Sequence, residues 1–102
     1  MRIMPGFYFR IHRHPAEVLL AVCDEEVLGH TFSEGDLRIT VGEGFYGGDL
    51  IEEEELRTRM GTFTIINIVG NRAVDIAVAE GIVDPDAVIV IGGVKHAQAV
   101  TL

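Results

Sequence analysis

The stretch that most constrains the fold of this chain runs from Thr62 to Gly93. Its pattern predicts a long, nearly all-apolar helix from Thr62 to about Glu80, a turn, and a buried strand from Ala87 to Ile91. A helix that is apolar around most of its circumference has to be covered by other elements. We therefore expect the rest of the chain to pack around a long central helix.

Two details belong to this predicted helix. At 3.6 residues per turn, its polar residues share one narrow stripe made of Thr64, Asn67, Asn71 and Asp75. Gly70 lies in the middle, where glycine costs roughly 1 kcal/mol relative to alanine, so we expect a neighbour to pack against bare backbone there. Gly81 ends the helix, and Asp84-Pro85 prevents it from resuming.

The N-terminal part of the chain predicts a β-hairpin. Gly6 to His12 alternates between apolar and polar residues, as a half-buried strand does. Glu17 to Cys23 is apolar almost throughout, as in a central strand covered on both faces. A turn at Arg13–Ala16 would join them, and a turn of that length places His12 opposite Glu17.

Shorter elements follow. Asp24 can cap a helical turn that ends at Gly29, and Leu37 to Val41 alternates as a third strand after a turn at 33–36. The glycine-rich loop 42–48 precedes a helix from about Leu50 to Met60, for which Asp49 and Glu52 form a capping box. Gly92-Gly93 predicts a tight turn from which Val94–Val100 returns as a strand, although Gly93 could instead open a short helix.

Together these elements predict a single α+β domain over residues 1–102, with two layers: a small, mostly antiparallel sheet packed on the long central helix. The opening residues lack the apolar core of a signal peptide, and no apolar run approaches the roughly 20 residues that span a membrane. One cysteine, Cys23, excludes an internal disulfide. We expect a cytoplasmic protein without a membrane partner.

Charge limits the partners further. The net charge of −8 argues against general affinity for nucleic acid backbones or anionic membranes. The acid-free N-terminal segment is the exception, because Tyr8, Arg10 and His12 share one face of the first strand. An aromatic residue, an arginine and a histidine on a sheet face can stack on bases and touch phosphates, so RNA is a possible partner. The alternative is a sheet face buried by a helix or by another subunit.

The segment 92–98 is the strongest local candidate for a small-molecule or anion site. A glycine pair ends a buried strand and is followed by polar side chains, the candidate residues being Gly92, Gly93, Lys95, His96 and Gln98. If the segment is a hairpin, His96 and Gln98 share a face while Lys95 points away.

Three other motifs are discounted. The GxGxxG of residues 42–47 precedes a helix start crowded with acids, which would repel a cofactor's pyrophosphate. His12 and His14 lack a third local ligand for zinc. Cys23 is followed by three acids that disfavour its thiolate. We therefore predict no cofactor and no metal.

Four segments carry a family resemblance. They are Cys23-Asp24-Glu25-Glu26-Val27-Leu28-Gly29 to Phe32, Phe45-Tyr46-Gly47-Gly48, Asn67-Ile68-Val69-Gly70-Asn71-Arg72-Ala73-Val74, and Val90-Ile91-Gly92-Gly93-Val94-Lys95-His96-Ala97-Gln98. In these the chain, from about Tyr8 to Gln98, resembles an archaeal family known only as domain of unknown function four-two-four. The resemblance implies an archaeal, cytoplasmic protein and brings with it no catalytic residue.

From the residues themselves we expect a non-catalytic binding or interaction domain. Its partner surface would combine the Tyr8/Arg10/His12 face with the His96/Gln98 end, and a protein partner, RNA or ribonucleoprotein could bind there. A homodimer fits a chain that is both small and apolar, with a mean hydropathy of +0.31. The rival hypothesis is a small enzyme or ligand-binding protein that uses Lys95, His96 and Gln98.

Overall fold

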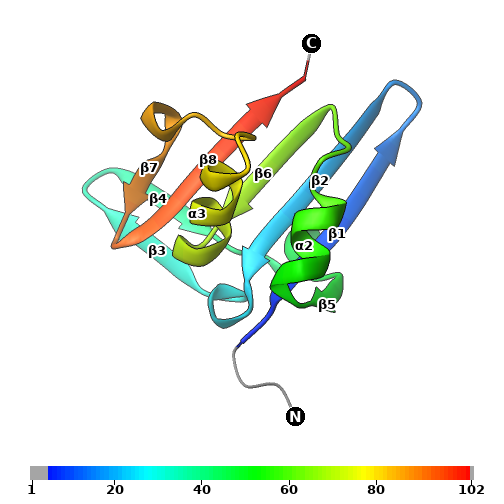
Figure 1. Ribbon diagram of the computed structural model, residues 1–102. Helices are drawn as coiled ribbons and strands as arrows, with labels where there is room; N and C mark the ends of the chain where they lie inside the picture. Colours follow the sequence, from blue (N-terminus) through cyan, green and yellow to red (C-terminus); the bar gives the residue numbers. More distant parts are fainter. Residues whose placement is uncertain (1–4, 102) are drawn as a thin grey trace.

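The computed structural model describes residues 5–101. Its central feature is a six-stranded sheet with the strand order β5-β1-β2-β6-β8-β7, accompanied by a separate two-stranded sheet, β3-β4 (Figure 1). The strands of the larger sheet are β1 (Phe7–His14), β2 (Glu17–Asp24), β5 (Asp49–Ile51), β6 (Ile65–Val69), β7 (Ile89–Ile91) and β8 (Val94–Val100). The smaller sheet consists of β3 (Thr31–Glu34) and β4 (Leu37–Thr40).

The helices are short. They are α1 (Glu43–Tyr46), α2 (Glu53–Arg59) and α3 (Asn71–Ala79), with the 3-10 turns η1 (Glu25–Val27) and η2 (Pro85–Ala87). In Figure 1, α2 and α3 lie in front of the large sheet, while the β3-β4 hairpin lies behind it. We call these two sides of the large sheet the helix face and the hairpin face.

The predicted long helix from Thr62 to Glu80 is wrong. Ile65–Val69 is strand β6, which lies parallel to β2 and antiparallel to β8. Gly70 then turns the chain with a φ of 124°, and only Asn71–Ala79 is helical. A strand covered on both faces is as apolar as a buried helix, so the apolar run alone did not separate the two structures. The predicted polar stripe is therefore broken up: Thr64 precedes β6, Asn67 lies in β6, and Asn71 and Asp75 lie on α3.

The fold is therefore α+β and mostly antiparallel, but a six-stranded sheet forms its centre in place of a long helix. Gly70 does meet a close neighbour, as predicted. A Cβ on Gly70 would lie 2.3 Å from the Cγ atom of Asp24.

The N-terminal hairpin is confirmed, with a tighter turn than predicted. β1 continues to His14 and β2 begins at Glu17, so only two residues form the turn. His14, and not His12, therefore lies opposite Glu17, and His12 lies opposite Leu19.

Several other boundaries differ from the prediction. The helix predicted from Leu50 begins at Glu53, after the three residues of β5. Glu52 is the N-cap residue of this helix, and no side-chain hydrogen bond caps it, so the predicted capping box is wrong. β3 was not predicted. β7 begins at Ile89 and is an edge strand whose first two residues are exposed, not a buried strand from Ala87. The strand at Val94–Val100 is confirmed, and no helix opens at Gly93.

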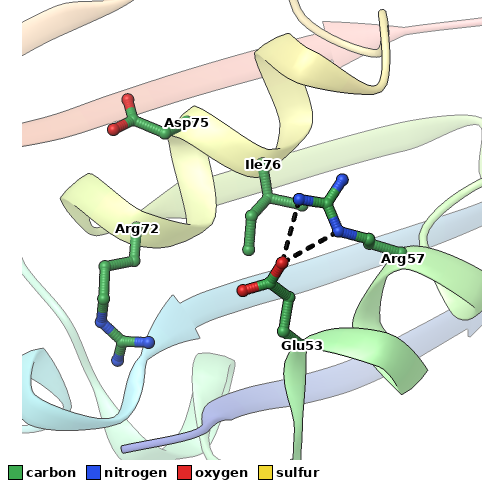
Figure 2. Close-up of a pocket in the computed structure, with 5 residues that line it drawn as sticks. All are labelled: Glu53, Arg57, Arg72, Asp75 and Ile76. Atoms are coloured by element: carbon green, nitrogen blue, oxygen red, sulfur yellow. Dashed lines mark hydrogen bonds and ion pairs between the residues drawn. The ribbon is translucent and has the colours of Figure 1, made fainter. Parts of the chain in front are cut away.

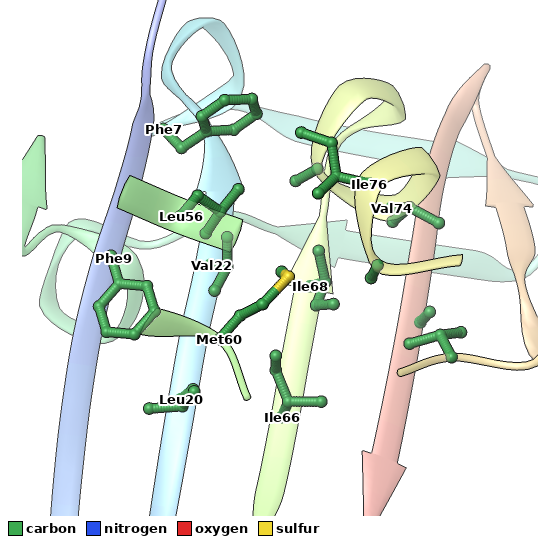
Figure 3. Packing of buried hydrophobic residues seen from close by; sticks show 14 of the residues in the cluster. Phe7, Phe9, Leu20, Val22, Leu56, Met60, Ile66, Ile68, Val74 and Ile76 are labelled. Carbon is green, nitrogen blue, oxygen red and sulfur yellow. The ribbon is translucent and has the colours of Figure 1, made fainter. Parts of the chain in front are cut away.

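The helix face holds the larger core (Figure 3). The sheet contributes Phe9, Leu20, Ile66 and Ile68 to this core. These side chains pack against Leu56 and Met60 from the α2 region and against Val74 and Ile76 on α3. The hairpin face holds a second core in which Ala21, Cys23 and Val69 meet Val41 and Tyr46, with Phe32 and Ile39 packed beside them. These two layers fix the positions of all candidate site residues.

Candidate interaction surface

The sheet register aligns the predicted site residues of the hairpin face in rows across β1, β2, β6 and β8. The three rows are Tyr8-Cys23-Val69-His96, Arg10-Ala21-Asn67-Gln98 and His12-Leu19-Ile65-Val100. The N-terminal trio and the His96/Gln98 pair thus share one face, as a combined surface requires. Three strand spacings separate them, which is roughly 14 Å.

The polar groups of the N-terminal trio are largely occupied by the chain itself. Arg10 is exposed, but its Nη1 donates to the carbonyl of Gly47 at 2.8 Å. The Nε2 atom of His12 lies 2.8 Å from the carbonyl of Phe45, and the His12 ring stacks on the Phe45 ring with 4.8 Å between centroids. Tyr8 is half-buried and packs against the second core. These contacts hold the glycine-rich loop and α1 against β1.

The middle of the hairpin face is covered by Tyr46 from α1. Its hydroxyl donates to the Oδ1 atom of Asn67 at 2.5 Å, beside the buried thiol of Cys23. Burial raises the pKa of Tyr46, and burial with the neighbouring Asp24 raises the pKa of Cys23 to about 12. Both groups stay protonated at neutral pH, so neither is a nucleophile.

The Gly92-Gly93 pair forms the turn between β7 and β8. Both residues have positive φ, at 57° and 83°, which is the geometry of a tight hairpin turn. The amide of Gly92 donates to Glu34 at 3.0 Å, and a Cβ on Gly92 would lie 2.8 Å from the carbonyl oxygen of Ser33. The glycine pair thus docks the β7-β8 hairpin on β3.

Lys95 faces away from His96 and Gln98, as predicted for a hairpin. Its Nζ lies on the helix face and pairs with Asp75 of α3 at 2.7 Å. His96 lies on the hairpin face, where its Nδ1 atom is 3.1 Å from the carbonyl of Ile68. Burial lowers the pKa of His96, so the ring is neutral at pH 7. The three side chains do not converge on one pocket.

The backbone of β8 has a free edge beyond β7. Lys95 and Thr101 direct their backbone groups toward the β6 side, because Lys95 accepts from Gly70 and Thr101 donates to Thr64. Backbone direction alternates along a strand, so Gln98 and Val100 point to the opposite side. On that side, the pairing of β7 with β8 extends only as far as the pair Ile89–His96. Among residues 5–101, no strand pairs with Gln98 or Val100 on that side.

A hollow and an apolar strip adjoin this edge. The hollow, of about 210 Å³, lies where the pairing of β7 with β8 stops. It is lined by Ala87, Ile89, His96, Ala97 and Gln98. On the hairpin face, the apolar row Leu19-Ile65-Val100 runs across β2 and β6 to this edge. Leu19 and Ile65 are half-buried, and Val100 at the edge is 64% exposed.

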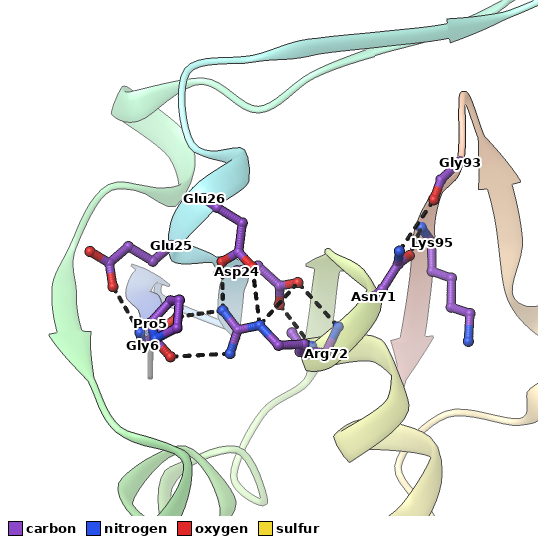
Figure 4. Close-up of polar contacts among 10 residues, drawn as sticks. Pro5, Gly6, Asp24, Glu25, Glu26, Asn71, Arg72, Gly93 and Lys95 are labelled. Carbon is purple, nitrogen blue, oxygen red and sulfur yellow. Dashed lines mark hydrogen bonds and ion pairs between the residues drawn. The ribbon is translucent and has the colours of Figure 1, made fainter. Parts of the chain in front are cut away.

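Asp24 and Arg72 organise a polar cluster that the sequence did not predict (Figure 4). Asp24, nearly fully buried, accepts hydrogen bonds from the amides of Arg72 at 3.1 Å and Ala73 at 2.8 Å, and so caps α3 instead of its own turn. Arg72 pairs with Glu26 at 2.5 Å and donates to the carbonyls of Pro5 and Gly6. A cap contributed from 48 residues away leaves no local signal.

A groove of about 280 Å³ lies between α2 and α3, lined by Glu53, Arg57, Arg72, Asp75 and Ile76 (Figure 2). Both arginines in it are already paired. Arg57 contacts Glu53 at 3.0 Å and Glu80 at 2.8 Å, and Arg72 contacts Glu26. An anionic ligand would have to displace these carboxylates, so the groove is a weak candidate for a binding site.

The part of the chain that the structure describes contains neither a metal-binding group of side chains nor a helix that could span a membrane. Over residues 5–101, no three His, Cys, Asp or Glu side chains are grouped closely enough to hold a metal ion. Within the same range, none of the helices has the length and apolar character needed to cross a membrane.

Comparison with known proteins agrees with the resemblance seen in the sequence. No curated protein matches the chain. A solved structure, described as an uncharacterized conserved protein from Methanopyrus kandleri, is similar at 28% identity and a TM-score of 0.72, over 90% of this chain and 88% of that one. The model of a family described as "Protein of unknown function (DUF424)" matches residues 12–102. The chain therefore belongs to this DUF424 family.

Proposed function

We propose that this protein is a non-catalytic interaction domain, which binds a protein partner along the free edge of β8 and the adjoining apolar strip of the hairpin face. The observation that carries the proposal is the free backbone of Gln98 and Val100 beside the exposed Val100 side chain. An exposed strand edge can take up a further strand through main-chain hydrogen bonds, and neighbouring pockets then select its side chains.

The polar chemistry of the domain supports a binding role over catalysis. Tyr46 and Cys23 are held in their protonated forms, and the histidine at position 96 is neutral and bonded to the backbone. The rival site at Lys95, His96 and Gln98 is divided between opposite faces of β8. A ligand would reach Lys95 or the other two side chains, but not all three.

An RNA partner on Tyr8, Arg10 and His12 has less support. Base stacking needs an open aromatic face, and phosphate binding needs an uncommitted cation. The His12 ring is stacked on Phe45, and the guanidinium of Arg10 is bonded to Gly47.

Site-specific photo-cross-linking in the native host tests the proposal. A benzoylphenylalanine replaces Val100 or Gln98 at the edge, or, as the control, the exposed Arg38 on β4. We expect both edge positions to cross-link to the same segment of the same protein, identified by mass spectrometry, and position 38 not to do so. Edge positions that give no more adduct than position 38 would refute the proposal.

A further inference from the structure

The free edge of β8 is complementary to itself. In an antiparallel ladder, opposed residues alternate between hydrogen-bonded pairs, which exchange both backbone hydrogen bonds, and non-hydrogen-bonded pairs. A two-fold axis at Ala99 places Gln98 opposite Val100 of a second copy, and Val100 opposite Gln98 of that copy. This register uses every free backbone group of both residues, which gives four hydrogen bonds.

Neighbouring registers leave groups unpaired. An axis at Gln98 would place Val100 opposite His96 of the second copy, whose backbone on that side already pairs with Ile89. Of the registers within the described residues, the axis at Ala99 is the one that matches free groups to free groups. We propose, in extension of the function proposed above, that the occupant of this edge is a second copy of the same chain, joined β8 to β8 about an axis at Ala99.

The charge distribution allows a second copy to bind at this edge. The chain carries a net charge of −8, so two copies repel each other over most of their surfaces. The segment Ala97–Thr101 has no ionisable side chain, and Lys95, two residues before it, is paired with Asp75. Sheet edges that are kept free usually carry charges or proline, and this one carries neither. By contrast, β5 at the opposite edge begins with Asp49.

Shape allows it as well. The register places Thr101 of the second copy opposite Ala97, where the hollow of about 210 Å³ leaves room beside β8. The two Ala99 side chains meet at the axis with their Cβ atoms roughly 5 Å apart, without a clash. On the hairpin face, the exposed Val100 side chain would pack beside Gln98 of the second copy. The apolar row Leu19-Ile65-Val100 would then continue across the interface.

The pairing is short, so the dimer is expected to be weak. Stable interfaces bury about 1,200–2,000 Å², and two strands paired over a few residues bury less. Sedimentation velocity from about 10 µM to about 1 mM should therefore show the average mass rising from 11.1 kDa toward twice that value.

A pair of charge-reversal variants tests the partner and the register together. Gln98→Lys/Val100→Lys places lysines opposite lysines in the dimer, and Gln98→Glu/Val100→Glu places glutamates opposite glutamates. Each variant alone should stay monomeric up to about 1 mM, and an equimolar mixture should associate. Both positions are exposed and keep their β6 pairing, and circular dichroism checks that each variant is folded.

Disulfide trapping gives a second measurement. Opposed residues in a non-hydrogen-bonded antiparallel pair lie about 4.5 Å apart at Cα, within reach of a disulfide. Ala99→Cys should therefore form a covalent dimer on mild oxidation, several-fold faster than Arg38→Cys. The native Cys23 is fully buried and does not compete.

The outcomes separate this inference from the proposed function. A wild type that stays monomeric, with Ala99→Cys no faster than Arg38→Cys, would overturn the dimer. If positions 98 and 100 still cross-linked to one other protein, the interaction domain would stand with a different partner. Absence of both signals would refute both proposals.

Discussion

Asp24 is the buried charge on which the start of α3 depends. Its two carboxylate oxygens accept from the amides of Arg72 and Ala73, which are otherwise unsatisfied at a helix N-terminus. Burial raises the pKa of Asp24, against the opposing effect of those hydrogen bonds and of Arg72. The sequence identified Asp24 as a helix cap but assigned it to the wrong helix, because sequence spacing shows only local caps.

His96 makes stability depend on pH. Burial lowers its pKa below the ordinary value of 6.5, and the carbonyl of Ile68 opposes this shift only in part. Between the folded-state pKa and 6.5 the unfolded chain binds more protons, so stability decreases as pH falls through that window. The neutral ring contributes its full stability above pH 6.5.

We predict that His96→Gln removes this dependence. Urea denaturation at pH 8 and pH 5.5 should show a smaller loss of unfolding free energy for His96→Gln than for the wild type. His30→Gln, at an exposed position, is the matched control and should behave as the wild type does. Equal losses in all three proteins would show that His96 does not contribute to the pH dependence of stability.

At the scale of elements, β1, β2 and β8 follow from the sequence pattern, whereas the strand within residues 62–80 was predicted as a helix. The strands with alternating or hairpin-linked patterns, β1, β2 and β8, were predicted because turn residues and periodicity agree there. β6 was not, because a strand buried on both faces shows no alternation. Its five residues, Ile-Ile-Asn-Ile-Val, are rich in β-branched side chains, which favour a strand and could have corrected the prediction.

Gly70 joins β6 to α3, and we predict that a side chain at this position destabilises the protein. Its positive φ is unfavourable for any side chain, and a Cβ there would overlap the Asp24 carboxylate. Gly70→Ala should lower the free energy of unfolding by about 3 kcal/mol, measured by urea denaturation.

Gly61 is the matched control for this prediction. A Cβ on Gly61 would have no neighbour within 4 Å, and its φ is not positive. Gly61→Ala should change the free energy of unfolding by no more than about 0.5 kcal/mol. If the two variants lost similar stability, close packing at the β6-α3 junction would not be the cause.

At the scale of the whole molecule, the candidate surface depends on long-range topology. The sequence predicted that Tyr8, Arg10 and His12 share a face, that His96 and Gln98 share a face, and that one partner surface combines the two. The sequence did not show how the two sets are joined, because their common face follows from the placement of β2 and β6 between β1 and β8. The free edge at Gln98 and Val100 was also not predicted from the sequence, since it depends on where the pairing of β7 with β8 stops.

Net charge then distinguishes the possible partners by salt dependence. Two copies that each carry −8 repel, and salt screens this repulsion, whereas the proposed contact contains no ion pair to be weakened. Self-association should therefore become several-fold tighter between about 50 mM and 500 mM salt, as measured by sedimentation velocity. Binding to RNA phosphates would show the opposite slope, because salt competes with counterion release. Association that weakened steadily with salt would indicate an interface built on opposite charges, and it would contradict the neutral β8-β8 pairing.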